Sequence, residues 1–205
     1  MEFKDSELHF LEHDLILRFG EEEGRRIFNR SMKLYAELVV TTDYKGSPTL
    51  EKQLKKLVYP VIAYYKTLLA YGYRQSAALG LVRYETEKAA QFSAERHAAQ
   101  MRKFFPFLAF RRNFSNFIEF KFPSAEWKVT NLRKGGWKLT FRVERCLYCQ
   151  IAAKFGCEEL STVFCDYERV AFAGLNPKIG AECNGSLADG HDYCEFVFTK
   201  GKKHK

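Results

Sequence analysis

The spacing of hydrophobic residues changes once along this chain, near residue 107, and this change constrains the fold more than any other feature. Before it, apolar residues recur every three or four positions, which is the spacing of an amphipathic helix. After it, residues 127–130 and 137–143 alternate between apolar and polar side chains on either side of Gly135 and Gly136, the pattern of a β-hairpin. The sequence therefore predicts a helical first half and a second half that mixes helices with strands.

Breaks in the first half divide it into separate helices. Ser6 is expected to be the N-cap of the first helix, which ends at Gly20. Three acidic residues at 21–23 follow, and their charge suits the positive end of a second helix. The Gly-Ser-Pro sequence at 46–48 ends that helix.

Further helices follow this break. A third helix is expected from about residue 49, and Pro60 within it predicts a kink. A fourth helix, rich in Ala and Glu, covers residues 75–103. Beyond the hairpin the pattern predicts two helices and then two strands, at 146–155, 158–172, 177–182 and 193–199.

These elements predict an α+β fold in which a helical N-terminal half packs on a C-terminal half with a small antiparallel sheet and two helices. We expect a helical region over residues 1–106 and an α+β, cysteine-rich region over residues 107–205. Because no long flexible linker separates them, we expect the two regions to pack as one compact unit.

All six cysteines of the chain lie after residue 145. They are Cys146, Cys149, Cys157, Cys165, Cys183 and Cys194. The chain opens without an apolar signal segment, so we expect a cytoplasmic protein with reduced thiols rather than three disulfides. Cysteine is used sparingly in protein cores, so this concentration predicts thiol, carboxylate or metal chemistry in the second half.

Charge and hydropathy limit the partners that we expect. The formal net charge is +8, but four of the positive charges come from lysines in the last six residues, and no recognised nucleic-acid-binding motif accompanies them. The longest uncharged run, residues 57–65, is nine residues long and far too short to cross a membrane. We therefore expect a small-molecule substrate, no nucleic acid and no membrane, while the sequence carries no signal for oligomeric state.

Five short motifs resemble those of one known family. They are Phe-Gly-Glu-Glu-Glu-Gly at 19–24, Phe-Arg-Val-Glu-Arg-Cys-Leu-Tyr at 141–148, Gly-Cys-Glu-Glu-Leu at 156–160, Phe-Cys-Asp-Tyr-Glu at 164–168 and Leu-Ala-Asp-Gly-His-Asp-Tyr-Cys-Glu-Phe at 187–196. In order and spacing, over most of the chain, they resemble the L-2-amino-thiazoline-4-carboxylic acid hydrolase family. Glu168 stands where that family has Asp, which keeps the charge and lengthens the reach, and Cys183 stands where a residue other than cysteine is expected.

The resemblance implies a small-molecule hydrolase that opens a thiazoline or a related cyclic amidine bearing a carboxylate, with no cofactor. It implies catalytic roles for Cys146, Cys165, Glu168 and Cys194. Cys165 and Glu168 are three residues apart in a predicted helix and therefore share a face. Either the Cys165 thiolate attacks the amidine carbon while Glu168 transfers protons, or Glu168 activates water while Cys165 shapes the pocket. The alternative is that neither residue is catalytic, with Cys165 a packed thiol and Glu168 a carboxylate on the helix surface.

Three further residues are expected to contact the substrate. A carboxylate on the substrate suits an arginine, and Arg145 lies next to the first cysteine. Tyr148 is expected to supply an aromatic wall. His191, in the loop before the last cysteine, is expected to act as a proton carrier.

A second hypothesis belongs to a different class of protein. The C-terminal region is faintly similar to vinyl-reductase-like ligand-sensing domains, which implies a non-enzymatic ligand-binding or sensor module with zinc at Cys165, Cys183 and Cys194. Cys146 and Cys149 also have the spacing of a zinc-ligand pair, but no second pair of this kind follows. No thioredoxin-like βαβ pattern surrounds them, so the sequence favours a redox role for this pair less than it favours a zinc site.

Overall fold

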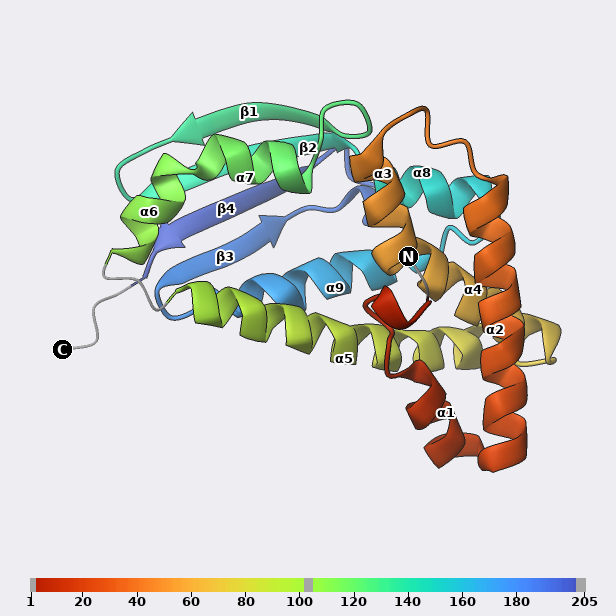
Figure 1. Ribbon diagram of the computed structural model, residues 1–205. Coiled ribbons are helices and arrows are strands. Elements are labelled where there is room, and N and C mark those ends of the chain that lie inside the picture. The colour runs from red at the N-terminus through yellow and green to blue at the C-terminus, as the bar shows by residue number, and fades with distance from the viewer. Residues whose placement is uncertain (1–2, 102–104, 202–205) are drawn as a thin grey trace. The chain divides into compact units, whose positions relative to one another are not determined.

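The computed structural model of the chain describes residues 3–101 and 105–201. Its elements, in chain order, are η1 (Phe3–Asp5), α1 (Leu11–Phe19), α2 (Glu21–Thr41), α3 (Pro48–Gln53), η2 (Leu54–Val58), α4 (Tyr59–Ala70), α5 (Gln75–Gln100), α6 (Pro106–Arg112), α7 (Phe114–Lys121), β1 (Lys128–Lys134), β2 (Lys138–Arg145), α8 (Leu147–Lys154), α9 (Leu160–Ala173), β3 (Ile179–Asn184), η3 (Leu187–Asp189) and β4 (Cys194–Lys200). Helices with one small antiparallel sheet form the α+β fold that the sequence predicts (Figure 1).

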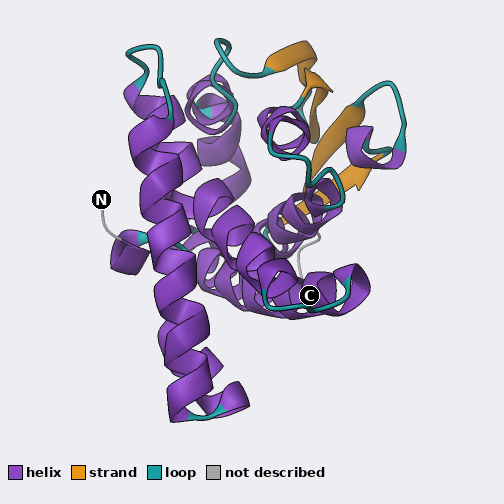
Figure 2. Ribbon diagram, turned by 90° about the vertical axis from the view of Figure 1, so that its right-hand side faces the viewer, coloured by secondary structure: helices purple, strands orange, loops and turns teal. Residues whose placement is uncertain are grey.

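The chain divides into two compact units, Met1–Ala89 and Ala90–Lys205, and the division falls inside α5. In the described part of the chain, the first unit holds only helices, and the strands of the second unit form one sheet (Figure 2). The boundary near residue 106 and the packing as one compact unit stay predictions. The last residues of the expected 75–103 helix and the lysines at 202, 203 and 205 lie outside the described residues.

In the first unit, α1 and α2 form a tight helical hairpin. Gly20 joins them with a φ of 84°, a value that favours glycine, and α2 begins at Glu21 as predicted. Gly24 lets the backbones approach closely, because a Cβ atom at this position would lie 2.6 Å from the carbonyl oxygen of Leu15. The prediction of Ser6 as N-cap is wrong, since its hydroxyl accepts the N–H of Leu8 within a turn and α1 begins only at Leu11.

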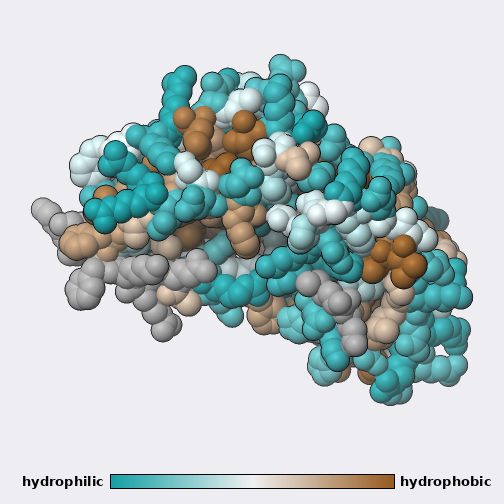
Figure 3. Space-filling model, turned by 45° about the horizontal axis from the view of Figure 1, so that its top comes forward, coloured by the Kyte–Doolittle hydropathy of each residue, from teal (hydrophilic) through white to brown (hydrophobic). Residues whose placement is uncertain are grey.

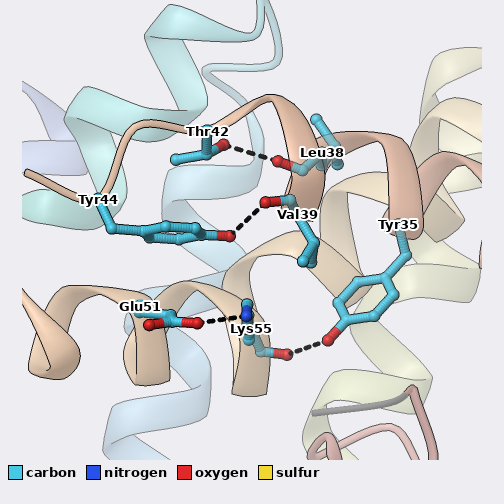
Figure 4. Close-up of polar contacts among 7 residues, drawn as sticks. All are labelled: Tyr35, Leu38, Val39, Thr42, Tyr44, Glu51 and Lys55. Carbon is cyan, nitrogen blue, oxygen red and sulfur yellow. Dashed lines mark hydrogen bonds and ion pairs between the residues drawn. The ribbon is translucent and has the colours of Figure 1, made fainter. Parts of the chain in front are cut away.

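The expected third helix is a run of α3, a π-helical turn (η2) and α4, and Pro60 explains the interruption. Proline has no N–H, so the carbonyl of Lys56, four residues earlier, loses its usual helical partner. That carbonyl instead accepts the backbone N–H of Glu7 at 2.8 Å. The neighbouring carbonyl of Lys55 accepts the hydroxyl of Tyr35 at 3.3 Å (Figure 4). Contacts from distant segments therefore satisfy the backbone groups at the π-helical turn.

Side chains also satisfy the carbonyls at the end of α2, which have no partner within the helix. The Thr42 hydroxyl donates to the Leu38 carbonyl at 2.7 Å, and the Tyr44 hydroxyl donates to the Val39 carbonyl at 2.9 Å (Figure 4). These bonds tie the loop after α2 back onto the last turn of the helix.

Glu85, in α5, is a fully buried carboxyl of the first unit. Among the described residues, no N–H or O–H group donates to either of its oxygens, and the Arg18 guanidinium lies 3.9 Å away. Burial, together with the charge of the adjacent Asp14, raises the pKa of Glu85 to about 7. The Lys88 ammonium pairs with Asp14. The protonated Glu85 can then donate its hydrogen to Asp14.

In the second unit, the strands are antiparallel in the order β1-β2-β4-β3. Residues that face one another across the central pair are Leu139 and Phe198, Phe141 and Phe196, and Val143 and Cys194. Helices α6, α7 and α9 cover this face: Phe110, Phe114 and Phe172 place their rings 5.2, 5.9 and 5.5 Å from that of Phe198. The core of the unit is therefore a layer of aromatic rings.

Helices α8 and α9 and strands β2, β3 and β4 confirm the sequence prediction to within about two residues, and β1 continues four residues beyond the predicted end of its run, to Lys134. Helices α6 and α7 are additional. The phenylalanines at 110, 114 and 117 recur every three or four positions and line one side of these two short helices. This helical spacing of phenylalanines is a local signal in the sequence for the two helices.

The described residues contain no helix that is long and apolar enough to cross a membrane. On the face drawn in Figure 3, hydrophilic residues cover most of the surface, with small groups of hydrophobic residues between them.

Two helical glycines make a matched test of the α1–α2 packing. We expect Gly24→Ala to lower the free energy of unfolding by about 1–3 kcal/mol, because the new methyl group overlaps the backbone of α1. Gly80→Ala, where a Cβ meets nothing within 4 Å, is expected to raise it by about 0.5–1 kcal/mol. Urea denaturation measures both, and equal effects would contradict the close approach.

A second prediction concerns the pH dependence of stability. The pKa of Glu85 rises from 4.5 to about 7 on folding, so the folded chain binds more protons between these values and loses stability as the pH increases through this window. Glu85→Gln removes this effect, and we expect its stability relative to the native protein to improve by on the order of 1–3 kcal/mol between pH 4 and pH 8. The exposed neighbour Glu87→Gln is the control and should show no such change. If the free energy of unfolding changed with pH in the same way for Glu85→Gln and the native protein, the raised pKa of Glu85 would be contradicted.

Candidate functional site

Two groups of reactive side chains lie in the second unit. The first, the thiol cluster, consists of Cys146, Cys149, Cys165, Cys183 and Cys194, which interact electrostatically with one another. The second, the Glu168 group, consists of Glu168, Tyr148, Lys121 and His97. Helix α9 contributes to both groups, since it carries Cys165 and Glu168.

The turn before η3 organises one side of the thiol cluster. Ser186 is the N-cap of η3, and its hydroxyl accepts the N–H of Ala188 at 3.1 Å. The Cys165 sulfur lies 3.5 Å from the same hydroxyl oxygen. The N–H of Leu187 donates to the Cys194 sulfur at 3.2 Å. One short turn therefore holds thiols from α9 and from the start of β4.

The thiols differ in their tendency to ionise. Burial raises the pKa of Cys165 to about 11, so this residue stays protonated at neutral pH. Hydrogen bonds from the Cys183 thiol, from the N–H of Leu187 and from the Ser186 hydroxyl lower the pKa of Cys194 to about 6. On this side of the cluster, hydrogen bonding therefore favours the thiolate form at Cys194.

The opposite side of the cluster lies at the start of α8. Cys146 is the N-cap of this helix and Cys149 lies in its first turn. Hydrogen bonds from the Cys146 thiol and from the Ser161 hydroxyl lower the pKa of Cys149 to about 7. Cys157 lies outside the cluster, where its thiol donates to the carbonyl of Ala152 at 3.4 Å.

Glu168 is a buried carboxylate with an incomplete set of hydrogen bonds. Its Oε1 atom accepts the Tyr148 hydroxyl at 2.8 Å and pairs with the Lys121 ammonium at 2.8 Å. Its Oε2 atom is buried and has no hydrogen-bond partner among the described residues. Buried carboxylate oxygens normally accept hydrogen bonds, so this atom is suited to an N–H or O–H group from a ligand.

His97 adds a neutral imidazole to this group. Its Nδ1 atom lies 2.8 Å from the carbonyl oxygen of Ala171, and because a carbonyl only accepts, Nδ1 carries the hydrogen. Burial lowers the pKa of His97, and Lys121 and Glu168 are close enough to influence it. The structure places His97 partly buried beside a charged pair, Lys121 and Glu168.

The structure places Cys165 and Glu168 one turn apart on α9, with different partners. Cys165 contacts Ser186, whereas Glu168 contacts Tyr148 and Lys121. Tyr148 connects the two groups, since burial raises the pKa of its hydroxyl and interactions with Glu168 and with Cys146 raise it further. The four expected catalytic residues therefore lie in two neighbouring groups of side chains.

The expected substrate-binding residues occupy different surroundings. Tyr148 is buried within the Glu168 group. Arg145 is exposed and donates to the carbonyl of Ala125 at 3.4 Å. His191 is exposed too, and its backbone N–H donates to the carbonyl of Ser186 at 3.1 Å.

Three contributors escaped the sequence analysis. Lys121 lies in α7, a helix that the sequence analysis does not predict. Ser161 and Ser186 were indistinguishable from ordinary surface serines, although Ser186 directly precedes the motif at 187–196. Ser161 has the same kind of signal, because it directly follows the motif at 156–160.

Among the described residues, no group of three or more Cys, His, Asp or Glu side chains is arranged to hold a metal ion. The zinc site at Cys165, Cys183 and Cys194 therefore stays a prediction from the sequence.

Comparison with known proteins identifies one family. A family model described as L-2-amino-thiazoline-4-carboxylic acid hydrolase matches residues 51–198, well over half of the chain. The matched range contains the thiol cluster and the Glu168 group. A search of curated proteins finds no match.

A double-mutant cycle tests the pairing of Lys121 with Glu168. Lys121→Met leaves a buried carboxylate without its cation, and we expect a loss of about 2 kcal/mol or more in the free energy of unfolding. Combining it with Glu168→Gln removes the unpaired charge, so the double variant should recover most of this loss. Additive losses in chemical denaturation would show that the two groups do not interact.

Proposed function

The chain belongs to the L-2-amino-thiazoline-4-carboxylic acid hydrolase family, and on this premise we propose that it is a small-molecule hydrolase that opens a thiazoline or a related cyclic amidine bearing a carboxylate. The observation that carries the proposal is the buried Oε2 atom of Glu168, which has no hydrogen-bond partner within the described part of the chain and lies one helical turn from the thiol cluster. An amidine offers N–H donors of the kind that this oxygen accepts.

In this proposal Glu168 orients the ring. Lys121 and Tyr148 occupy its Oε1 atom, which leaves Oε2 for an amidine N–H. The ammonium of Lys121 pairs with this carboxylate, which can bind a cationic amidinium and can also take up a proton from it. Arg145, exposed at the end of β2, is the residue that we propose for the substrate carboxylate.

The proposed nucleophile is Cys194 rather than Cys165. Hydrogen bonding lowers the pKa of Cys194 to about 6, whereas burial raises that of Cys165 to about 11. A thiolate attacks carbon and a thiol does not, so Cys194 is the better nucleophile at neutral pH. Cys165, protonated beside Ser186, is then available as a proton donor to the leaving atom.

The atoms of the reaction balance with one water molecule. The Cys194 sulfur bonds to the ring carbon between nitrogen and sulfur, and the π electrons of the C=N bond move to nitrogen, which takes a proton. The ring C–S or C–N bond then breaks, and the leaving atom takes a second proton. Water displaces the Cys194 sulfur and restores the thiolate, leaving an open-chain product with a free thiol or a free amine.

Free thiols are needed throughout this sequence of steps, so we also propose a cytoplasmic location, where thiols stay reduced. The proposed chemistry uses side chains of this chain and a small-molecule substrate, with no cofactor.

The test is turnover of 2-amino-thiazoline-4-carboxylate by the purified chain, followed by mass spectrometry of the ring-opened product. We expect Cys194→Ser and Glu168→Gln each to lower kcat/KM by about 100-fold or more, since both remove groups that act on the reacting atoms. Cys157→Ser, outside the cluster and still able to donate to Ala152, is the matched control and should retain activity. Circular dichroism confirms that each variant is folded.

Two outcomes would overturn the proposal. Full activity in both variants would remove Cys194 and Glu168 from the mechanism. Absence of turnover with thiazolines and other cyclic amidines, together with stoichiometric zinc retained on dialysis, would favour the ligand-binding alternative.

A further inference from the structure

Cys146 and Cys149 lie together at the point where β2 leads into α8. Cys146 follows the strand directly and has an extended backbone (φ −109°, ψ 122°) as N-cap of the helix. Cys149 lies three residues further along, in the first turn of the same helix. The two thiols interact electrostatically with one another.

The two thiols differ in access to solvent. Cys146 is buried, with 8% of its surface exposed, whereas Cys149 is partly exposed. A small molecule in solution therefore reaches Cys149 first. Donation from Cys146 and Ser161, together with the positive end of α8, stabilises a thiolate on Cys149 and lowers its pKa to about 7. The same hydrogen bond raises the pKa of Cys146 and keeps its proton in place.

We propose that Cys146 and Cys149 form a redox-active dithiol that exchanges with small-molecule disulfides. The Cys149 thiolate attacks one sulfur of the small disulfide, forms a mixed disulfide and releases the first small thiol. Cys146 then loses its proton, attacks the Cys149 sulfur and releases the second small thiol. Two electrons and two protons pass from the protein dithiol to the small disulfide, and an internal Cys146–Cys149 disulfide remains.

The arrangement makes the second step favourable once the first has occurred. Before exchange, the negative charge on Cys149 opposes ionisation of Cys146. Formation of the mixed disulfide removes that charge, so Cys146 ionises more readily beside the sulfur that it attacks. The order of events follows from the burial of Cys146 and the exposure of Cys149.

The other thiol pair of the cluster is less suited to a disulfide. Cys183 in β3 lies opposite Phe196, so Cys194 is its diagonal neighbour across the strands. Diagonal residues in an antiparallel pair stand farther apart than residues directly opposite, and a disulfide needs Cβ atoms about 3.5–4.5 Å apart. The dithiol is therefore assigned to Cys146 and Cys149.

The positions of basic residues make the test direct. Trypsin cleaves after Arg145 and Lys154, so Cys146 and Cys149 share one peptide, residues 146–154, that contains no other cysteine. The reduced full-length chain is incubated with oxidised glutathione at pH 7, alkylated and digested. We expect two glutathione molecules released per chain and a 146–154 peptide that is unalkylated and lighter by two hydrogen atoms.

Variants separate the two steps. Cys146→Ser should stop at a mixed disulfide on Cys149 with one glutathione released, and Cys149→Ser should leave the peptide reduced. Cys183→Ser is the control and should react like the native chain. Linkage of Cys149 to another peptide, a mixed disulfide that persists in the native chain, or no reaction at Cys149 would overturn the proposal. The readout needs no thiazoline, so it stands or fails separately from the proposed hydrolysis.

Discussion

The second unit depends on aromatic packing against one face of its sheet. Phe141, Phe196 and Phe198 present their rings on this face, and Phe172 of α9 packs against two of them, 6.1 Å from Phe196 and 5.5 Å from Phe198. Such ring pairs add about 0.5–1.5 kcal/mol each beyond the burial of apolar area. This packing holds α9 in place, and α9 carries both Cys165 and Glu168.

Burial of α9 also sets the electrostatics of the candidate site. Away from water, a charge is stable only beside a hydrogen-bond donor or an opposite charge. Glu168 pairs with Lys121, and the N–H of Leu187 donates to the Cys194 sulfur. At Cys165 burial outweighs the effect of the Ser186 hydroxyl, so its pKa is raised and the thiol stays protonated. The difference between thiol and thiolate within one cluster therefore follows from which backbone and side-chain donors reach each sulfur.

Much of the fold was predictable because local signals agreed with tertiary packing. Gly20 and the acidic residues at 21–23 mark the junction of α1 and α2, and the alternating runs around Gly135 mark the hairpin. The prediction that Ser6 is the N-cap of α1 was wrong because its hydroxyl accepts the N–H of Leu8, only two residues ahead, within a turn. At Pro60 the sequence predicted a disturbance but not its form, since the π-helical turn depends on donors from Glu7 and Tyr35.

The sequence by itself determined the α+β class, the family and the residue types of the candidate site, because periodicity and motif spacing are local properties of the chain. Only the tertiary structure decided which thiol ionises and which carboxylate oxygen is left without a donor. Tyr148 lies twenty residues from Glu168 in sequence, and Ser186 lies twenty-one from Cys165. Ionisation and hydrogen bonding depend on such distant neighbours and on burial, and both exist only after the chain has folded.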